Sequence, residues 1–305
     1  VYVYSGYRLM PAMQSLFSSL GSIESARSAL DRIHESVTKS QAVDHHQVPA
    51  RPITFKNQLS LQGLSYHYPG YERLVLKDLN LNIHHHEIVG IIGHTGAGKT
   101  TLIDILLGLL QPTSGHLAVD GLQLACKTTR SAWQSMIGYV PQHIYLSDSS
   151  IAHNIAFGVD PEAIDLKVVG RVAKIAAIHD FIAEQLPNGY HTMVGERGVK
   201  LSGGQIQRIG IARALYHQPK VLILDEATSS LDHQTESDVM RAIYNMRNKM
   251  TMVIIAHRLS TVACCDRVVL LNEGQVIDEG DLESLRHRHA GLSNRLQNTS
   301  SVALL

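Results

Sequence analysis

The chain has 305 residues, of which 44% are apolar and 18% are charged, an ordinary globular balance that can fill one large domain or two smaller ones. Basic and acidic residues are equal at 27 each, so no net charge draws the protein toward nucleic acid or an anionic membrane. The three cysteines, Cys126, Cys264 and Cys265, form no CxxC pair. We therefore expect no disulfide framework and a reducing compartment such as the cytoplasm.

The N-terminal part of the chain predicts one long helix. Apolar residues recur at helical spacing over residues 9–37 and form a single stripe, and Pro11 is expected to kink this helix or to mark its first turn. The stripe fits either a soluble coiled-coil arm or the cytoplasmic end of a last membrane helix. No window of the sequence is long and apolar enough for a complete span. The apolar start Val1-Tyr2-Val3-Tyr4 without an initiator Met suggests a piece of a longer protein, cut within or just after a membrane helix.

A linker and a set of short strands follow. Residues 38–52 are polar, aperiodic and contain two prolines, which predicts a linker. Strand-like runs cover residues 59–68, 79–83 and 87–93, a helix is expected over 99–110, and Asp120-Gly121 suits a tight hairpin turn. The triplet His84-His85-His86 lies between two apolar runs. It indicates a turn and not a metal site or a tag, because three adjacent side chains cannot all face one ion from a strand.

The rest of the chain predicts an α/β domain with an inserted helical lobe. Residues 149–214 are mostly helical by their periodicity. After them, strand runs at 221–224, 252–256 and 268–271 alternate with helices, which favours a mainly parallel sheet covered on both faces. We assign residues 53–290 to this domain and residues 291–305 to a C-terminal tail.

The first chemical motif is a glycine-rich loop between an apolar strand and a helix. It is a full GxxxxGK[ST] and consists of Gly93, His94, Thr95, Gly96, Ala97, Gly98, Lys99 and Thr100. Its glycines let backbone N–H groups converge on phosphate oxygens, and the helix N-terminus favours negative charge. Lys99 would reach the β- and γ-phosphates of a nucleotide, and the Thr100 hydroxyl would ligate Mg²⁺. The alternative is a glycine-rich turn with a solvated lysine.

Two acids follow a buried strand directly. Asp225 and Glu226 come after the apolar run 221–224, and ligands of open α/β sheets lie beyond the carboxyl ends of the strands. Asp225 suits a Mg²⁺ partner acting through water, and Glu226 suits a base that polarises the attacking water. The alternative is that these acids only cap the next helix.

A second helix start also favours an anion. Leu201-Ser202-Gly203-Gly204-Gln205 opens a predicted helix over roughly residues 205–216 and offers N–H groups and a hydroxyl donor. A plain N-cap with a flexible turn is the alternative. One nucleotide cannot easily occupy two such sites in one chain unless it is shared between chains.

The Leu201–Gln205 sequence LSGGQ, with the phosphate loop before it and the Asp225-Glu226 pair after it, resembles the nucleotide-binding domains of ABC transporters over residues 51–287. The resemblance implies a P-loop ATPase fold with a mainly parallel core sheet, an antiparallel β subdomain and an inserted helical subdomain. It also implies a head-to-tail dimer. Each ATP then lies between the phosphate loop of one copy and Ser202, Gly203, Gly204 and Gln205 of the other.

Further residues match positions of this family. The resemblance implies that Tyr68 stacks on adenine, although such a ring could equally pack into a core. Gln142 matches the glutamine loop, which touches Mg²⁺ and senses the membrane domain, and Asp232 matches the loop that crosses the dimer. His257 matches the histidine that contacts the γ-phosphate, although alone it would suit a buried histidine. Thr101 is assigned to the nucleotide site as well.

The family resemblance extends to the exporter type. Residues 192–198 resemble the segment by which exporter ATPase domains contact their membrane domains, and residues 7–11 resemble the last-helix region of half-transporters for lipid-linked oligosaccharides or polysaccharides. One departure is His86-Glu87, where the family commonly has Gly-Glu; it alters a turn and not the chemistry.

The sequence thus predicts an ATPase, at the cytoplasmic face of a membrane, that drives export of a lipid, a lipid-linked glycan or a peptide. Its expected partners are a second nucleotide-binding domain and a transmembrane domain, with no nucleic acid. One alternative is a soluble ABC-type ATPase acting on nucleic acid or ribosomes, which the balanced charge and the lack of long insertions disfavour. The other is a regulatory module that binds ATP without turnover, against which the presence of Glu226 and His257 argues.

Overall fold

The computed structural model describes residues 2–41, 53–228, 230–256 and 259–289. These residues belong to two compact units, Val1–Pro49 and Ala50–Leu305. The first unit holds helix α1 (Tyr2–Gln41), which has Pro11 inside it, so the proline does not mark the first turn. The helix includes residues 38–41, which the sequence analysis placed in the linker. The rest of that linker and the tail 291–305 lie outside the described residues.

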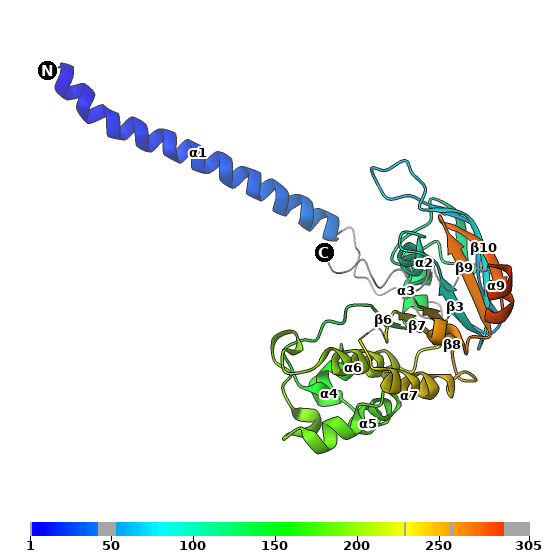
Figure 1. The fold of residues 1–305 in the computed structure, drawn as a ribbon. Coiled ribbons are helices and arrows are strands. Elements are labelled where there is room, and N and C mark those ends of the chain that lie inside the picture. Colours follow the sequence, from blue (N-terminus) through cyan, green and yellow to red (C-terminus); the bar gives the residue numbers. More distant parts are fainter. Residues whose placement is uncertain (1, 42–52, 229, 257–258, 290–305) are drawn as a thin grey trace. The chain divides into compact units, whose positions relative to one another are not determined.

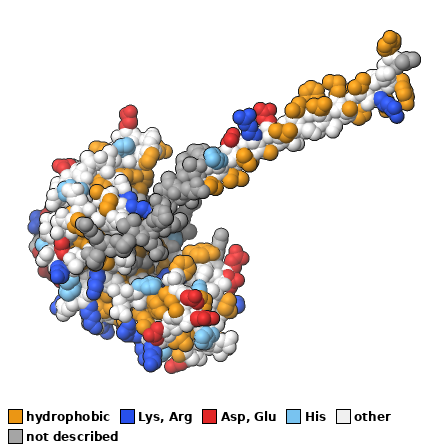
Figure 2. Space-filling view, turned by 180° about the vertical axis from the view of Figure 1, so that it is seen from behind, with side chains coloured by type: hydrophobic (Ala, Val, Ile, Leu, Met, Phe, Trp, Pro, Cys, Tyr) orange, Lys and Arg blue, Asp and Glu red, His pale blue; other side chains and the backbone are white. Residues whose placement is uncertain are grey.

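The apolar stripe of α1 is exposed along the helix. Leu16, Ile23 and Ile33 are each more than half accessible, and Figure 2 shows hydrophobic side chains along the length of this helix. Within the described residues, no helix combines the length and the apolar character that crossing a bilayer requires.

The second unit contains two sheets (Figure 1). A four-stranded antiparallel sheet has the order β2-β1-β4-β5 and consists of β1 (Gln58–Tyr66), β2 (Leu76–His84), β4 (Ser114–Val119) and β5 (Leu122–Gln123). A six-stranded sheet has the order β10-β9-β3-β8-β7-β6 and is parallel except for β10. Its strands are β3 (Ile88–Ile92), β6 (Ile137–Val140), β7 (Val221–Asp225), β8 (Thr251–Ile255), β9 (Arg267–Asn272) and β10 (Gln275–Gly280).

Helices cover the sheets and form the inserted lobe. They are α2 (Lys99–Leu106), α3 (Lys127–Gln134), α4 (Ile151–Ile155), α5 (Leu166–Ile175), α6 (Gly203–Tyr216), α7 (His233–Tyr244), α8 (Leu259–Val262) and α9 (Leu282–Arg288). Short 3-10 turns lie at Pro161–Ala163, Gly189–His191 and Glu196–Gly198, and a π turn lies at Phe181–Gln185. The predicted α/β fold with a parallel sheet, an antiparallel β part and a helical insertion is confirmed.

The core sheet is buried on both faces, as its continuous apolar strands require. On one face, residues such as Ile88, Leu222 and Ile254 pack with α4, α5, α6 and α7. On the other face, the alternate residues, such as Val89 and Ile223, pack with α2, α3 and the antiparallel sheet. Because successive strand residues point to opposite faces, α2 and α6 lie on opposite sides of the sheet.

Two turns show how local sequence sets the path of the chain. Asp120 and Gly121 have φ of 49° and 83°, the pair of left-handed residues that a tight hairpin between β4 and β5 requires. The predicted histidine turn is also present, and it joins β2 and β3, which belong to different sheets. His86 has φ of 65°, a conformation in which glycine costs less than histidine, so the structure explains why glycine is common in the family there.

The helix predicted over residues 99–110 is shorter in the structure. α2 ends at Leu106 because Gly108 turns left-handed, with φ of 68°, and the N–H of Leu109 returns to the carbonyl of Asp104. This is a common way to end a helix.

Candidate functional site

Several of the predicted site residues follow strands of the core sheet at the edge where those strands end. The phosphate loop follows β3, Asp225 ends β7 and Gln142 lies two residues after β6. In the register of the sheet, Ile91 and Asp225 both lie opposite Ile255 of β8, which separates β3 from β7. The carboxyl ends of these parallel strands therefore meet at one edge, where open α/β sheets bind ligands. His257 follows β8 in the sequence and lies outside the described residues.

The phosphate loop requires glycine at defined places. Gly98 has φ of 101°, and a Cβ there would lie 2.9 Å from the Cδ2 of Leu76. A Cβ on Gly93 would lie 2.4 Å from the Leu271 carbonyl oxygen, so the loop could not keep this path with a side chain. Gly96 has φ of 83° with nothing within 4 Å of its Cβ position. The space in front of Gly96 is therefore open for a phosphate group, and the residues present fit the predicted nucleotide.

Lys99 is held inside the curl of this loop. Its side chain is buried, and its Nζ donates hydrogen bonds of 2.7 Å to the Gly93 carbonyl and 3.1 Å to the His94 carbonyl. Burial lowers the pKa of the Lys99 ammonium, and the charges of Glu226 and Asp225 oppose that shift. A cation held by the neutral carbonyls of the loop is suited to receive a phosphate oxygen.

The two threonines at the start of α2 differ in exposure. Thr100 is exposed, whereas Thr101 is buried. The Thr101 hydroxyl lies 3.1 Å from the hydroxyl of Tyr68, whose ring is 39% exposed and packs edge-on against Tyr66. The structure therefore brings Tyr68 to the phosphate-loop helix with part of its ring accessible, as a stacking residue for a nucleotide base requires.

The two acids and Gln142 form one polar cluster. The Gln142 Nε2 donates a hydrogen bond of 2.9 Å to the Oε2 of Glu226. Burial raises the pKa of the Asp225 carboxyl, and the charge of Glu226 raises it further. Glu226 has φ of 50°, and such left-handed backbone in a non-glycine residue concentrates at functional sites.

Asp225 and Glu226 do not cap the next helix, which was the alternative to their chemical role. The N-cap of α7 is Asp232, whose Oδ1 accepts a hydrogen bond of 3.0 Å from the Thr235 N–H. The hydrogen bonds from the Thr235 N–H and side chain lower the pKa of Asp232. Asp232 is exposed at this position, and its predicted contact across a dimer stays a prediction.

The LSGGQ segment forms the start of α6, which begins at Gly203, slightly earlier than predicted. Ser202 is its N-cap: the Ser202 Oγ accepts from the Gln205 N–H at 3.3 Å, and the Gln205 Oε1 accepts from the Ser202 N–H at 2.8 Å. This reciprocal pair is a capping box. Gly204 lies against the loop before α7, since a Cβ there would be 3.3 Å from the Leu231 Cδ2. Because α6 and α2 lie on opposite faces of the core sheet, this segment and the phosphate loop belong to different sides of one chain.

The sequence analysis missed two polar residues of the predicted site and one buried acid outside it. The Tyr139 hydroxyl donates to Asp225 at 3.4 Å, and burial, followed by the charge of Asp225, raises the pKa of Tyr139 to about 12. Gln207 is buried, and its Oε1 accepts from the Ser230 N–H at 3.0 Å; a polar residue on the apolar side of a predicted helix could have drawn attention to it. Glu236 is buried as well, and nothing in its sequence context distinguishes it from a surface acid.

Comparison with known proteins finds similarity to ABC transporters. A family model described as ABC transporter matches residues 76–229. The alpha-hemolysin translocation ATP-binding protein HlyB of Proteus vulgaris is 43% identical over 237 residues, which are 75% of this chain and 33% of that protein. The ATP-dependent lipid A-core flippase of Alkalilimnicola ehrlichii is 37% identical over 274 residues, or 89% of this chain and 45% of that protein.

A solved structure gives the same result. A bacterial Atm1-family ABC exporter with ATP bound matches with a TM-score of 0.77 and 33% identity, over 90% of this chain and 49% of that one. The chain thus spans between a third and a half of the length of these relatives.

Proposed function

Because this chain belongs to the ABC transporter family, we propose that it binds and hydrolyses ATP, with Mg²⁺, to drive export of a substrate across a membrane. The observation that carries the proposal is the cluster at one sheet edge, where Lys99 lies in a glycine loop and the Gln142 amide holds the Glu226 carboxylate at 2.9 Å. The relatives are named for translocation and flipping, which supports export. An ATPase acting on nucleic acid or ribosomes is not favoured.

The residues divide the chemistry among them. The ammonium of Lys99 and the loop N–H groups would bind the phosphates and orient the terminal one. Glu226 would accept a proton from the attacking water, and the hydrogen bond from the Gln142 amide would keep that carboxylate oriented. Thr100, Gln142 and Asp225 would hold Mg²⁺, which neutralises phosphate charge when bound. His257 would contact the γ-phosphate.

The proposed working unit contains two copies of the ATPase domain, arranged head to tail. The start of α6 is a second helix N-terminus that could bind an anion. It lies on the opposite side of the core sheet from α2, the helix that follows the phosphate loop. A nucleotide bound to the phosphate loop of one copy would be covered by Ser202–Gln205 of the other. We further propose that residues 1–37 are the cytoplasmic end of a last transmembrane-domain helix and that residues 53–290 are the ATPase domain at the cytoplasmic face of the membrane. The cargo would be a lipid, a lipid-linked glycan or a peptide.

The substitution Glu226→Gln tests this function. It keeps the size and the hydrogen bond from Gln142 but removes the base, so turnover should fall by about a thousandfold while equilibrium ATP binding is retained. The ATP-bound dimer should accumulate and be visible by size-exclusion chromatography with ATP. Glu162→Gln, an exposed acid of the helical lobe, is the matched control and should hydrolyse ATP at the unmodified rate. Wild-type turnover in Glu226→Gln would contradict the assignment of the base.

A further inference from the structure

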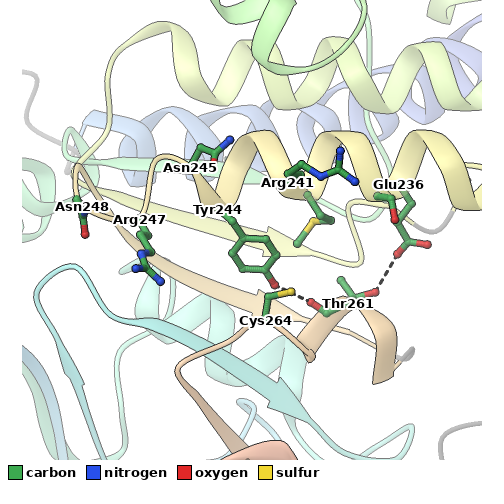
Figure 3. Close-up of a pocket in the computed structure, with 10 residues that line it drawn as sticks. Glu236, Arg241, Tyr244, Asn245, Arg247, Asn248, Thr261 and Cys264 are labelled. Atoms are coloured by element: carbon green, nitrogen blue, oxygen red, sulfur yellow. Dashed lines mark hydrogen bonds between the residues drawn. The ribbon is translucent and has the colours of Figure 1, made fainter.

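A buried carboxylate outside the ATP cluster joins three segments of the chain. Glu236 lies on α7 and is 6% exposed. Its Oε1 accepts a hydrogen bond of 2.9 Å from the Thr228 hydroxyl and another of 2.9 Å from the Thr261 hydroxyl. Both threonines are buried as well. Figure 3 shows Glu236 and Thr261 pointing toward one another, with the hydrogen bond between them as a dashed line.

The three segments are those that carry the proposed chemistry. Thr228 lies two residues after Glu226 in the loop that leaves β7, and Thr261 belongs to α8, which follows His257 in the sequence. Glu236 itself follows the N-cap of α7, and its N–H donates to the Asp232 carbonyl at 2.8 Å. One carboxylate oxygen therefore ties the loop after the proposed base to α7 and to α8.

An open pocket lies beside this tie, between α7 and the segment that includes α8. Its volume is about 720 Å³, and its lining includes Met240, Tyr244, Thr261 and Cys264 (Figure 3). A second hydrogen bond crosses between the two segments, because the Tyr244 hydroxyl donates to the Thr261 carbonyl at 3.1 Å. Thr261 is thus held from two points of α7.

We propose that Glu236 is a positioning residue for ATP hydrolysis, which sets the loop after Glu226 and helix α8 in the alignment that turnover requires. The proposal rests on the proposed function. A hydrogen bond from a hydroxyl to a carboxylate is stronger than one between neutral groups, and it gains strength in a buried setting. Small displacements of catalytic groups reduce rates strongly. Loss of the tie should therefore lower the maximal rate and leave ATP affinity, which the phosphate loop determines, nearly unchanged.

The test compares Glu236→Ala with Glu236→Gln in steady-state ATP hydrolysis by the whole chain. Both hydrogen bonds end on Oε1, which glutamine retains. We expect kcat to fall about tenfold in the alanine variant, with KM for ATP changed less than about twofold. The glutamine variant should recover part of the loss, because it keeps the acceptor and loses the charge. Asp238→Ala, an exposed acid of the same helix, is the matched control and should leave both constants unchanged.

Two further variants keep the test valid if Glu236→Ala does not fold. Thr228→Val and Thr261→Val each remove one hydroxyl and keep the shape of the side chain, and thermal unfolding will establish that they are folded. Each should lower kcat more than KM changes. Unchanged kcat in both folded valine variants, an effect on KM alone, or equal losses in Glu236→Ala and Glu236→Gln would overturn the proposal. If the unmodified chain hydrolyses no ATP, the proposed function itself fails, which is a separate outcome.

Discussion

The two helix starts with anion-binding geometry differ in how their polar groups are satisfied. At α2 the N-cap is Gly98, which has no side chain to cap the helix. The Lys99 ammonium donates its hydrogen bonds to carbonyls of the loop. At α6 the cap is Ser202, and its hydroxyl and the Gln205 amide satisfy each other's backbone N–H groups. The first site is prepared for a ligand that supplies negative charge. The second is already complete within its own chain.

This difference suggests an order of events. A helix start that lacks a side-chain cap gains most from a phosphate group, so nucleotide should bind first at Gly93–Thr100. The capped start of α6 gains less, and its contribution should come only when a second copy presents it to the bound nucleotide. The phosphate loop would then determine the affinity for ATP, whereas turnover would require both the phosphate loop and the start of α6.

The largest expected effect comes from Lys99→Ala. Removal of the ammonium deletes charged hydrogen bonds to the phosphates, and ATP affinity should fall about 100-fold or more. Isothermal titration calorimetry with the whole chain measures it directly. Lys174→Ala, which removes an exposed lysine of α5, should leave the affinity unchanged. Equal affinity in Lys99→Ala and the unmodified chain would refute the assignment of the phosphate loop.

A mixing experiment tests whether the two helix starts act on the same nucleotide from different copies. Lys99→Ala and Ser202→Arg should each be inactive alone, because both sites of either dimer contain one damaged half. A dimer with one copy of each variant has one site with both halves intact. With random pairing and independent sites, an equal mixture should recover about a quarter of the unmodified rate. No recovery in any mixture would contradict the shared site.

The contrast between the two sites also explains what the sequence could predict. The phosphate loop is a local motif, and its context between an apolar strand and a helix was enough to predict the loop between β3 and α2, the helix that Lys99 begins. The Asp225-Glu226 pair could be placed beside it because parallel strands end at the same edge of a sheet. The capping box of Ser202 and Gln205 is likewise local, since its partners are three residues apart.

The features that were missed depend on contacts between distant segments. The turn at His85-His86 was predicted, but its strands enter different sheets, which only the packing of the whole domain decides. Glu236 meets Thr228 and Thr261 through tertiary contacts, and a helical acid of this kind reads as a surface residue in sequence. The end of α2 was placed too late because a left-handed glycine stopped the helix before its apolar pattern ended.

A smaller effect, on the free energy of unfolding, is expected from a change at Ser202, the N-cap of α6. Ser202→Ala removes the acceptor for the Gln205 N–H, and loss of such a cap lowers the free energy of unfolding by about 1 kcal/mol. The ATP affinity of a single copy should not change, because the phosphate loop is intact. Thermal or urea unfolding and calorimetry give the two quantities. Ser131→Ala, which changes an exposed serine inside α3, is the control; a loss of ATP affinity in Ser202→Ala would contradict the division of roles.

The smallest expected effect is on stability at Asp225, where a substitution should stabilise the fold and not destabilise it. Burial raises the pKa of Asp225, with the charge of Glu226 adding to the shift, so the folded state holds its proton more tightly than the unfolded state. Stability then falls as pH rises from the unfolded pKa to the folded pKa of Asp225, and the full cost is present above the folded pKa. Asp225→Asn should therefore raise the unfolding temperature at pH 7, even though it impairs hydrolysis, and this gain should shrink as the pH is lowered toward the pKa of an unfolded aspartate.

Asp278→Asn provides the matched case in which the sign is reversed. Hydrogen bonds from the Arg288 guanidinium lower the pKa of Asp278, so its ionised form stabilises the folded state above the unfolded pKa, and that contribution is lost as pH falls. The variant should be less stable than the parent at pH 7 and approach it in acid. If Asp225→Asn also lowered the unfolding temperature at pH 7, burial would not dominate the effect of the Asp225 carboxyl on stability. Hydrogen bonds within the chain would then stabilise the ionised carboxyl, just as they already pair the N–H groups at the start of α6.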